Sequence, residues 1–299
     1  MCAIAQGTQC AVEIGTVGVW SRELRFHHDR AEARDAAAEL EALGFHALFI
    51  PDVGGDVLAA VAELLDATRA IPLATGILNI WMHDAAAVGA GVAAIERRHP
   101  GRFLLGLGAS HAAVVDAETP GRYERPLSAM RAYLDALDDA AETVVPARRI
   151  LAALGPRMLE LARERSSGAH PYLVPVEHTR IARAALGPDR LLAPEISVLI
   201  DPDPQRALER ARAFVSDYLA LPNYAHNLLR LGYPPAEVDQ PGSERLVRDL
   251  VAFGDPDTIA ARVAAHRQAG ADHVTLHVIG AGETLPREQW RALAAALLA

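Results

Sequence analysis

The chain has 299 residues, of which 51% are hydrophobic and 22% are charged, and this composition excludes a disordered or low-complexity protein. Its formal net charge of -9 argues against nucleic acid or an anionic membrane surface as the main partner, because both attract basic proteins. Apart from histidine, every basic residue is an arginine, so a lysine Schiff base is excluded and a phosphate would be held by arginine, hydroxyl or backbone N–H groups.

Short β-rich segments alternate along the chain with segments whose apolar residues recur at helical spacing. The predicted strands span residues 14–20, 47–50, 73–78, 103–108, 150–154, 169–172, 196–200 and 273–278. The predicted helices span residues 29–43, 85–98, 125–140, 157–165, 178–186 and 256–269, followed by one from residue 286 to the C-terminus. Eight strands alternating with helices predict an α/β protein, a single (β/α)8 TIM barrel over residues 1–299.

Local signals support several of these boundaries. Asp255 and Pro256 suit the N-cap and first position of a helix, while Gly44 and Gly270 stand where a helix would end in a left-handed residue. One stretch, approximately residues 213–254, is too long for an ordinary connection after a barrel strand. We expect it to be a helical insertion between strands 7 and 8 that covers one rim of the barrel.

Two glycine-rich segments raise the question of a dinucleotide-binding loop. Residues 89–94 (GAGVAA) match the G-x-G-x-x-A pattern but lie inside a predicted helix, so close helix packing is the favoured interpretation. Residues 106–111 (GLGASH) do follow a strand, although no helix is expected to start there. They are predicted to form a tight loop at the C-terminal rim of the barrel, where active sites of this fold lie.

A candidate phosphate site follows the fifth predicted strand, in residues 153–158 (ALGPRM). Gly155 permits close approach of the backbone, Pro156 begins a helix, and the free N–H groups of the first helical turn would face an anion at the rim. Arg157 could add a charged hydrogen bond. The alternative is an ordinary strand-to-helix turn with proline at the first helical position.

Three titratable side chains stand near the C-terminal ends of predicted strands, the position of chemical groups in a barrel. They are His111, His170 and Asp52. Asp52 could orient a ligand or accept a proton, or it could merely cap a turn. His273 and His277 lie too far apart along one strand to share a metal ion, and no His-Glu-x-x-His motif occurs, so we expect no metal site.

The N-terminal region carries no targeting signal, and no apolar run is long enough to span a bilayer. The only cysteines, Cys2 and Cys10, are too few for a disulfide scaffold or a four-ligand zinc site. We therefore expect a cytoplasmic protein.

Six motifs, taken in order along the chain, resemble the bacterial luciferase-like superfamily of flavin and deazaflavin enzymes. They are VGVW (17–20), ATGILNIW (74–81), PGRFLLGLG (100–108), RYERP (122–126), LGPR (154–157) and GDPD (254–257). Within the superfamily, the chain is most similar to the actinobacterial branch of coenzyme F420-dependent oxidoreductases. The resemblance implies a TIM barrel with an insertion in its C-terminal half, and a homodimer.

The resemblance also implies roles for individual residues. A cis peptide bond at Gly76–Ile77 would support one face of the cofactor ring, with Asn79 at the ring edge, and Asp52 would be a polar group in the pocket. The residues placed around the ring and its phosphate are Gly76, Ile77, Asn79, Gly108, Ala109, Ser110, Leu154, Gly155, Pro156 and Arg157. Some deazaflavin-dependent relatives carry an acid where this chain has His111, so proton transfer there would use imidazole, with His170 and Asp52 in reserve.

The function implied is that of an F420-dependent oxidoreductase, which transfers a hydride between the deazaflavin and a small organic substrate. Aromatic residues that would wall the pocket, or else belong to the core, are Trp20, Trp81 and Tyr172. Insertion residues that would set substrate specificity are Asn223, Tyr224 and His226. Two alternatives stay open, an FMN-dependent two-component monooxygenase and a non-catalytic barrel that binds a cofactor.

Overall fold

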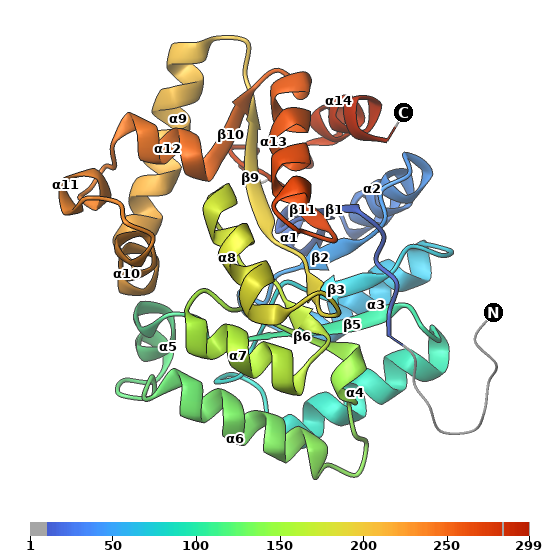
Figure 1. The fold of residues 1–299 in the computed structure, drawn as a ribbon. Coiled ribbons are helices and arrows are strands. Elements are labelled where there is room, and N and C mark those ends of the chain that lie inside the picture. The colour runs from blue at the N-terminus through green and yellow to red at the C-terminus, as the bar shows by residue number, and fades with distance from the viewer. Residues whose placement is uncertain (1–10, 283, 299) are drawn as a thin grey trace.

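The computed structural model describes residues 11–282 and 284–298, and these form a barrel of parallel strands surrounded by helices (Figure 1). The strands are β1 (Val17–Trp20), β2 (Leu48–Ile50), β3 (Leu73–Thr75), β4 (Leu78–Asn79), β5 (Phe103–Gly108), β6 (Arg149–Leu151), β7 (Gly168–Ala169), β8 (Leu191–Leu192), β9 (Glu195–Ile200), β10 (Val251–Gly254) and β11 (Val274–Val278). The predicted fold class is confirmed. Cys2 and Cys10 lie outside the described residues.

The α-helices follow in chain order. They are α1 (Glu23–Phe26), α2 (Arg30–Ala42), α3 (Val57–Ala67), α4 (Ala85–Arg98), α5 (Ala112–Glu118), α6 (Pro126–Asp138), α7 (Pro156–Arg165), α8 (Val176–Leu186), α9 (Pro204–Leu219), α10 (Pro222–Arg230), α11 (Pro235–Val238), α12 (Glu244–Leu250), α13 (Pro256–Gln268) and α14 (Arg287–Leu297). A short 3₁₀ helix, Pro146–Arg148, precedes β6. None of the helices in the described ranges combines the length and the apolar character needed to cross a bilayer.

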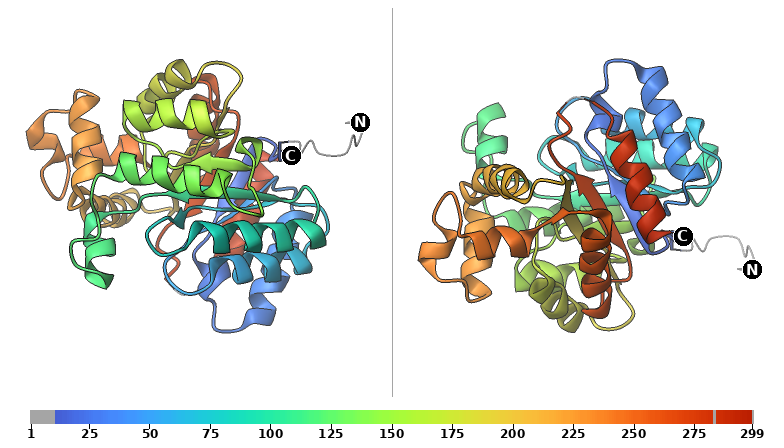
Figure 2. Two further views of the ribbon diagram at one scale, coloured as in Figure 1. Left: turned by 90° about the horizontal axis from the view of Figure 1, so that it is seen from below. Right: turned by 90° about the horizontal axis from the view of Figure 1, so that it is seen from above.

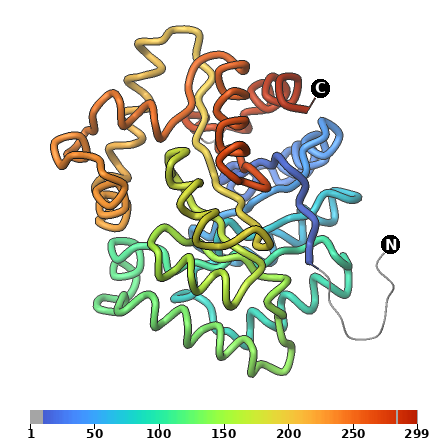
Figure 3. The backbone as a smooth tube through the Cα atoms, in the orientation of Figure 1, coloured from blue at the N-terminus to red at the C-terminus, as the bar shows by residue number. Residues whose placement is uncertain are grey.

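The barrel closes because its first and last strands pair and because β8 and β9 together act as its seventh strand. β1 lies between β2 and β11, which places the blue and red ends of the chain side by side (Figure 3). β8 pairs with β7, and β9 pairs with β11. Between β8 and β9, the N–H groups of Ala193 and Glu195 donate to the carbonyls of Ala169 and Pro171, so the parallel pairing continues across Pro194.

The predicted helix boundaries hold where the capping chemistry is strong. The Asp255 side chain accepts from the backbone N–H of Thr258, 2.8 Å away, at the start of α13. Gly44 (φ +91°) and Gly270 (φ +106°) adopt the left-handed conformation just after α2 and α13. Gly89 lies in α4, where a Cβ would stand 2.4 Å from the carbonyl oxygen of Glu142, so this glycine serves helix packing and not a nucleotide loop.

Some elements differ from the sequence-based expectation. α3 was missed although its buried residues, Val57, Val61, Leu64 and Leu65, have helical spacing, because the alanines between them make the run almost continuously apolar. The expectation that no helix follows residues 106–111 is wrong, because α5 begins at Ala112 with His111 as its N-cap residue. Strand 73–78 is divided into β3 and β4 by a bulge, and β8 and β10 were not predicted.

The predicted insertion between the seventh and eighth barrel strands is present. Helices α9 to α12 and strand β10 occupy this part of the chain, and they stand together on one side of the barrel (Figure 2). Their own apolar cluster includes Val215, Leu228, Val238 and Leu246, all buried. β10 extends the sheet by pairing with the second half of β9.

Candidate functional site

The bulge between β3 and β4 lies at the C-terminal end of the barrel strands. The peptide bond Gly76–Ile77 is cis, as the resemblance implies. The indole Nε1 of Trp20 donates to the carbonyl oxygen of Gly76 at 2.6 Å, and the backbone N–H of Asp52 donates to that of Ile77 at 3.3 Å. Both carbonyls of the bulge are therefore held by residues at the ends of β1 and β2.

Ile77 lies across the end of β5 because glycines there leave room for it. A Cβ on Gly108 would stand 2.5 Å from the Cδ1 atom of Ile77, and a Cβ on Gly106 would stand 1.9 Å from the carbonyl oxygen of Thr75. Ile77 is partly exposed, whereas its neighbours Gly76 and Leu78 are buried. The arrangement presents a low, apolar surface at the barrel mouth, suited to one face of a planar ring.

Asp52 is a support of this bulge. Its carboxylate Oδ2 accepts from the backbone N–H of Asn79 at 3.0 Å and contacts Nε2 of His83 at 2.7 Å. Oδ1 lies 3.9 Å from Nη2 of Arg25, and both side chains are almost completely buried. Burial lowers the pKa of Arg25, while the charge of Asp52 opposes that shift. Within the described residues, Asp52 Oδ1 has no hydrogen-bond partner.

The predicted phosphate segment forms the start of α7, with Gly155 as N-cap and Pro156 at the first position. Arg230, at the end of α10, lies beside it: a Cβ on Gly155 would stand 3.4 Å from Nη2 of this arginine. Nε2 of His178 contacts the carbonyl oxygen of Leu154 at 2.9 Å. Arg157 and Arg230 are both exposed, so two arginines accompany the positive end of a helix dipole.

His111 lies between the barrel and the insertion. Its Nδ1 is 3.0 Å from Oδ1 of Asn223 on α10, and its ring centroid is 5.3 Å from that of Tyr224. Because an amide oxygen can only accept, Nδ1 carries the proton and Nε2 is left with a lone pair. Burial lowers the pKa of His111, so the imidazole is neutral at pH 7.

The residues before His111 are also fixed. Ser110 adopts a positive φ of 55°, and its carbonyl oxygen lies 3.4 Å from the hydroxyl of Tyr123. Trp81 donates from Nε1 to the carbonyl oxygen of Ala109 at 2.7 Å. The loop after β5 therefore packs against Trp81.

Aromatic and polar side chains fill the opposite part of the mouth. The Tyr172 hydroxyl lies 2.8 Å from that of Tyr218 and 3.2 Å from Nδ1 of His277, whose ring packs 4.3 Å from Trp20. Beneath them, Nδ1 of His277 lies 3.4 Å from Oε1 of the fully buried Glu195. Burial raises the pKa of Tyr172 and brings that of Tyr218 to about 12, so both phenols stay protonated.

The structure places the remaining predicted residues elsewhere. His170 lies inside the barrel, stacked 4.6 Å from Phe49, with Nδ1 against the carbonyl oxygen of Ala193. Its burial lowers the pKa to about 4. His226 is exposed and lines a separate cavity of about 340 Å³ within the insertion. No group of three or more metal-ligating side chains occurs in the part of the chain that the structure describes.

Sequence reasoning missed several residues of this region. Arg230, His83, Glu195, Tyr218 and His277 all contact or adjoin predicted positions. His277 had a usable signal, since it stands near the end of a predicted strand. Arg230 had none, because 75 residues of chain separate it from Gly155.

Comparison with known proteins agrees with this fold. A Mycobacterium tuberculosis protein described as a coenzyme F420-dependent oxidoreductase is 24% identical over 164 residues. The aligned part makes up 54% of this chain and 45% of that relative, so less than half of the relative's length is matched.

Solved structures superimpose along almost the whole chain. The coenzyme F420-dependent tetrahydromethanopterin reductase of Methanopyrus kandleri has a TM-score of 0.76 at 16% identity, covering 96% of this chain and 99% of that one. The FMN complex of the oxygenating component of 3,6-diketocamphane monooxygenase from Pseudomonas putida has a TM-score of 0.64 at 13% identity, covering 94% and 96%. The sequence model of the luciferase-like monooxygenases matches residues 13–273. The chain therefore belongs to the luciferase-like monooxygenase family.

Proposed function

We propose that this protein is a coenzyme F420-dependent oxidoreductase, which transfers a hydride between the deazaflavin and a small organic substrate. One observation carries the proposal: the low apolar surface at Ile77 lies across the end of β5, and the helix N-terminus at Gly155 follows the neighbouring strand β6, at the same end of the barrel. A flat ring with a phosphate-bearing tail needs both. The descriptions of the M. tuberculosis relative and of the M. kandleri reductase both name F420, and this supports the choice of cofactor.

The residues present fit such a cofactor. Ile77, supported by Gly76 and Trp20, would lie against the ring, and the start of α7 with Arg157 and Arg230 would hold the phosphate. When bound, F420 supplies a carbon centre that gives or accepts a hydride. The protein's own task is then to orient the substrate and move one proton.

His111 is suited to that proton transfer. The Asn223 amide holds the proton on Nδ1, so Nε2 is free to accept a proton from a substrate hydroxyl as its carbon loses a hydride. In the opposite direction, the protonated Nε2 returns this proton to the oxygen of a carbonyl substrate. Asn223 and Tyr224 belong to the insertion, which thereby positions the proton carrier and borders the substrate.

The second candidate is an FMN-dependent monooxygenase. The likeness to the FMN-bound camphane monooxygenase favours it, as does the family itself. An FMN phosphate could occupy the same helix N-terminus. The two cofactors differ in charge, because F420 carries a longer acidic tail than FMN. F420 therefore needs more cationic side chains around its binding site.

Replacing Arg230 by Gln is expected to weaken F420 binding by roughly tenfold or more, because a charge-assisted hydrogen bond to an anion is lost. Binding is measured through the cofactor's fluorescence. Arg163→Gln is the matched control, since Arg163 is an exposed arginine at the opposite end of α7. If Arg230→Gln and the unaltered protein bound F420 with equal affinity, the proposal that Arg230 holds the phosphate would be wrong.

Turnover is tested by following F420 absorbance with panels of alcohols and, for reduced F420, of aldehydes and ketones. We expect one class to be turned over, and His111→Gln to lower that rate by about 10²–10⁴-fold while F420 affinity changes little. If His111→Gln turned over the substrate at an unchanged rate, a group other than His111 would transfer the proton. Absence of turnover with any substrate despite tight F420 binding would favour the non-catalytic alternative.

A further inference from the structure

A cluster of polar side chains inside the barrel takes no part in the proposed proton transfer. Its centre is Glu195, at the start of β9, whose side chain is fully buried. The carboxylate accepts from the hydroxyl of Ser197 at 2.9 Å and from the backbone N–H of Leu173 at 3.1 Å. Among residues 11–282 and 284–298, the one basic side chain within ion-pair distance is that of His277. A buried carboxylate is costly to the fold, so its presence here calls for an explanation.

His277 reaches this carboxylate from β11. Its Nδ1 lies 3.4 Å from Oε1 of Glu195 and 3.2 Å from the hydroxyl oxygen of Tyr172. Because a carboxylate oxygen only accepts, the proton of the imidazole belongs on Nδ1. The strand register places His277 between Ser197 on β9 and Trp20 on β1. The imidazole ring therefore has a fixed place and orientation beneath the barrel mouth.

The imidazole of His277 packs against the indole of Trp20. The two ring centroids lie 4.3 Å apart, with an angle of 51° between the planes, and Trp20 is almost completely buried. Trp20 in turn contacts the bulge, because its Nε1 donates to the carbonyl oxygen of Gly76 at 2.6 Å. A Cβ on Gly76 would stand 2.9 Å from Cδ1 of this indole. A chain of three contacts thus connects Glu195 with the bulge.

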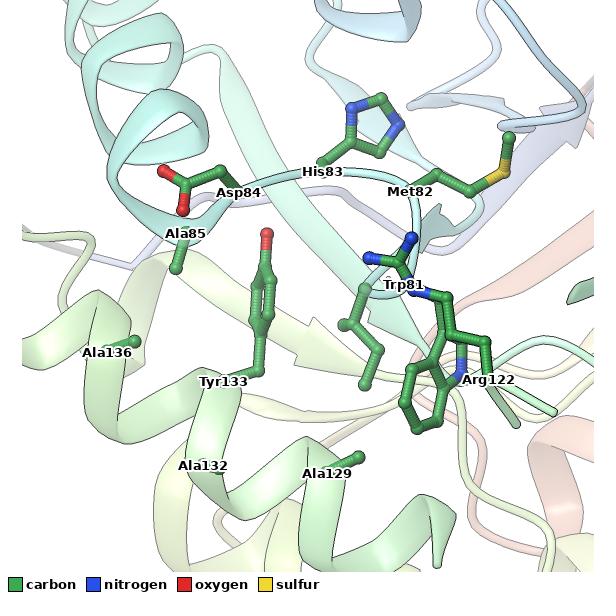
Figure 4. Close-up of a pocket in the computed structure, with 11 residues that line it drawn as sticks. Trp81, Met82, His83, Asp84, Ala85, Arg122, Ala129, Ala132, Tyr133 and Ala136 are labelled. Atoms are coloured by element: carbon green, nitrogen blue, oxygen red, sulfur yellow. The ribbon is translucent and has the colours of Figure 1, made fainter. Parts of the chain in front are cut away.

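The segment that follows the bulge offers less support. Residues 80–85 and one face of α6 border a depression that is open to solvent, and Met82 within it is 42% exposed (Figure 4). The bulge therefore depends mainly on Asp52 and Trp20, whose side chains bind its backbone. Of these two, Trp20 keeps its position through His277.

We propose that Glu195 and His277 are positioning residues for the cofactor ring. The carboxylate holds the imidazole, the imidazole holds the indole of Trp20, and the indole positions the Ile77 surface by binding the Gly76 carbonyl. The inference rests on the proposed function in one respect, that the ring lies against Ile77. It also explains the costly buried carboxylate, since an apolar residue would fill the same space without orienting His277.

Two fluorescent ligands separate binding of the ring from binding of the phosphate. One is F420, and the other is its chromophore with the ribityl chain but without phosphate. Glu195→Gln keeps the shape of the side chain but removes its charge, and it is expected to weaken binding of both ligands by the same factor, roughly tenfold. Arg230→Gln should weaken binding of F420 alone. Thr275→Val is the matched control: Thr275 pairs with Glu195 in the strand register, but its buried hydroxyl has no partner within the described residues, so both affinities should stay unchanged.

His277→Asn tests the same connection without leaving Glu195 unpaired. The amide N–H of asparagine can still donate to the carboxylate, but no ring remains against Trp20, so the phosphate-free chromophore should again bind roughly tenfold more weakly. Trp20→Phe should weaken its binding as well. Adding Glu195→Gln to Trp20→Phe should cause little further loss, because both changes break one chain of contacts.

Circular dichroism establishes that each variant is folded before it is titrated. Losses of affinity that multiply in the double variant would overturn the proposal, as would unchanged chromophore binding in His277→Asn. A loss confined to F420 in Glu195→Gln would connect the carboxylate with the phosphate and overturn it too. If the unaltered protein itself bound neither ligand, the proposed function would fail, and the inference with it, so the two failures are told apart.

Discussion

Lowering the pH from 7 to 5 is expected to remove several kcal/mol from the free energy of unfolding of this protein. The cause is a set of buried histidines whose pKa values burial lowers to about 4 for His170 and about 3 for His266 and His273. All three are at most 2% exposed. They stay neutral in the folded protein at pH 5, whereas the unfolded chain binds a proton at each below about pH 6.5.

The sign follows from which state takes up protons. Because the unfolded state binds more of them, stability is fully present above pH 6.5 and falls as the pH drops towards the folded pKa values. Each histidine contributes a loss of about 2 kcal/mol at pH 5. Burial makes these sites intolerant of charge: His170 and His273 lie inside the barrel, with their rings 4.6 and 5.7 Å from that of Phe49.

Urea unfolding at pH 7, 6 and 5 measures this loss. Replacing His266 by Gln should reduce the loss of unfolding free energy between pH 7 and 5 by the contribution of one histidine. This imidazole has few partners to lose, because Nδ1 contacts only the Thr179 hydroxyl and Nε2 has no partner within the described residues. His28→Gln, at an exposed position, should leave the pH dependence unchanged. A free energy of unfolding that stays constant between pH 7 and 5 would contradict the burial of these imidazoles as neutral groups.

Replacing Asp52 by Ala is expected to cost about 3 kcal/mol of stability, since it leaves the Arg25 guanidinium buried without its counter-charge. The change also removes the acceptor for the Asn79 N–H and the contact to His83. The bulge at Ile77 then loses a support, so F420 affinity should fall by about tenfold. Thermal unfolding and cofactor fluorescence measure the two effects.

The control for Asp52→Ala is Asp257→Ala, an exposed carboxylate in the first turn of α13 whose loss costs about 1 kcal/mol or less. In the double variant Arg25→Met, Asp52→Ala, part of the stability should return, because the uncompensated charge is gone. Unchanged stability and unchanged F420 affinity in Asp52→Ala would contradict both roles of the carboxylate, as the counter-charge to Arg25 and as a support of the bulge at Ile77.

Periodicity and capping residues predicted the barrel because each strand and helix carries its own signal. Asp255 and Gly270 bound α13 almost where expected, since caps act within one turn. β8 and β10, of two and four residues, escaped prediction, whereas strands as short as β7 were predicted, so strand length alone does not explain these two misses. Pro194 further hid that β8 and β9 form one barrel strand.

The candidate site was predictable only where its residues are neighbours in sequence. The Gly76–Ile77 bulge and the start of α7 are local motifs, and both occur at the rim as expected. Long-range contacts could not be predicted. His111 and Asn223 were each predicted as site residues, but nothing in the sequence indicates that they contact each other across 112 residues. The interior place of His170 was also not predictable, because a strand end gives no sign of whether a side chain faces the core or the mouth.

Separate fluorescence titrations of the purified protein with coenzyme F420 and with FMN test the proposed function most directly. The arrangement of Ile77, Gly155 and Arg230 predicts saturable F420 binding in the micromolar range and much weaker binding of FMN. Tighter binding of FMN than of F420 would contradict the account and assign the protein to the flavin monooxygenases. Binding of neither cofactor would contradict both assignments and leave the barrel without the proposed chemistry.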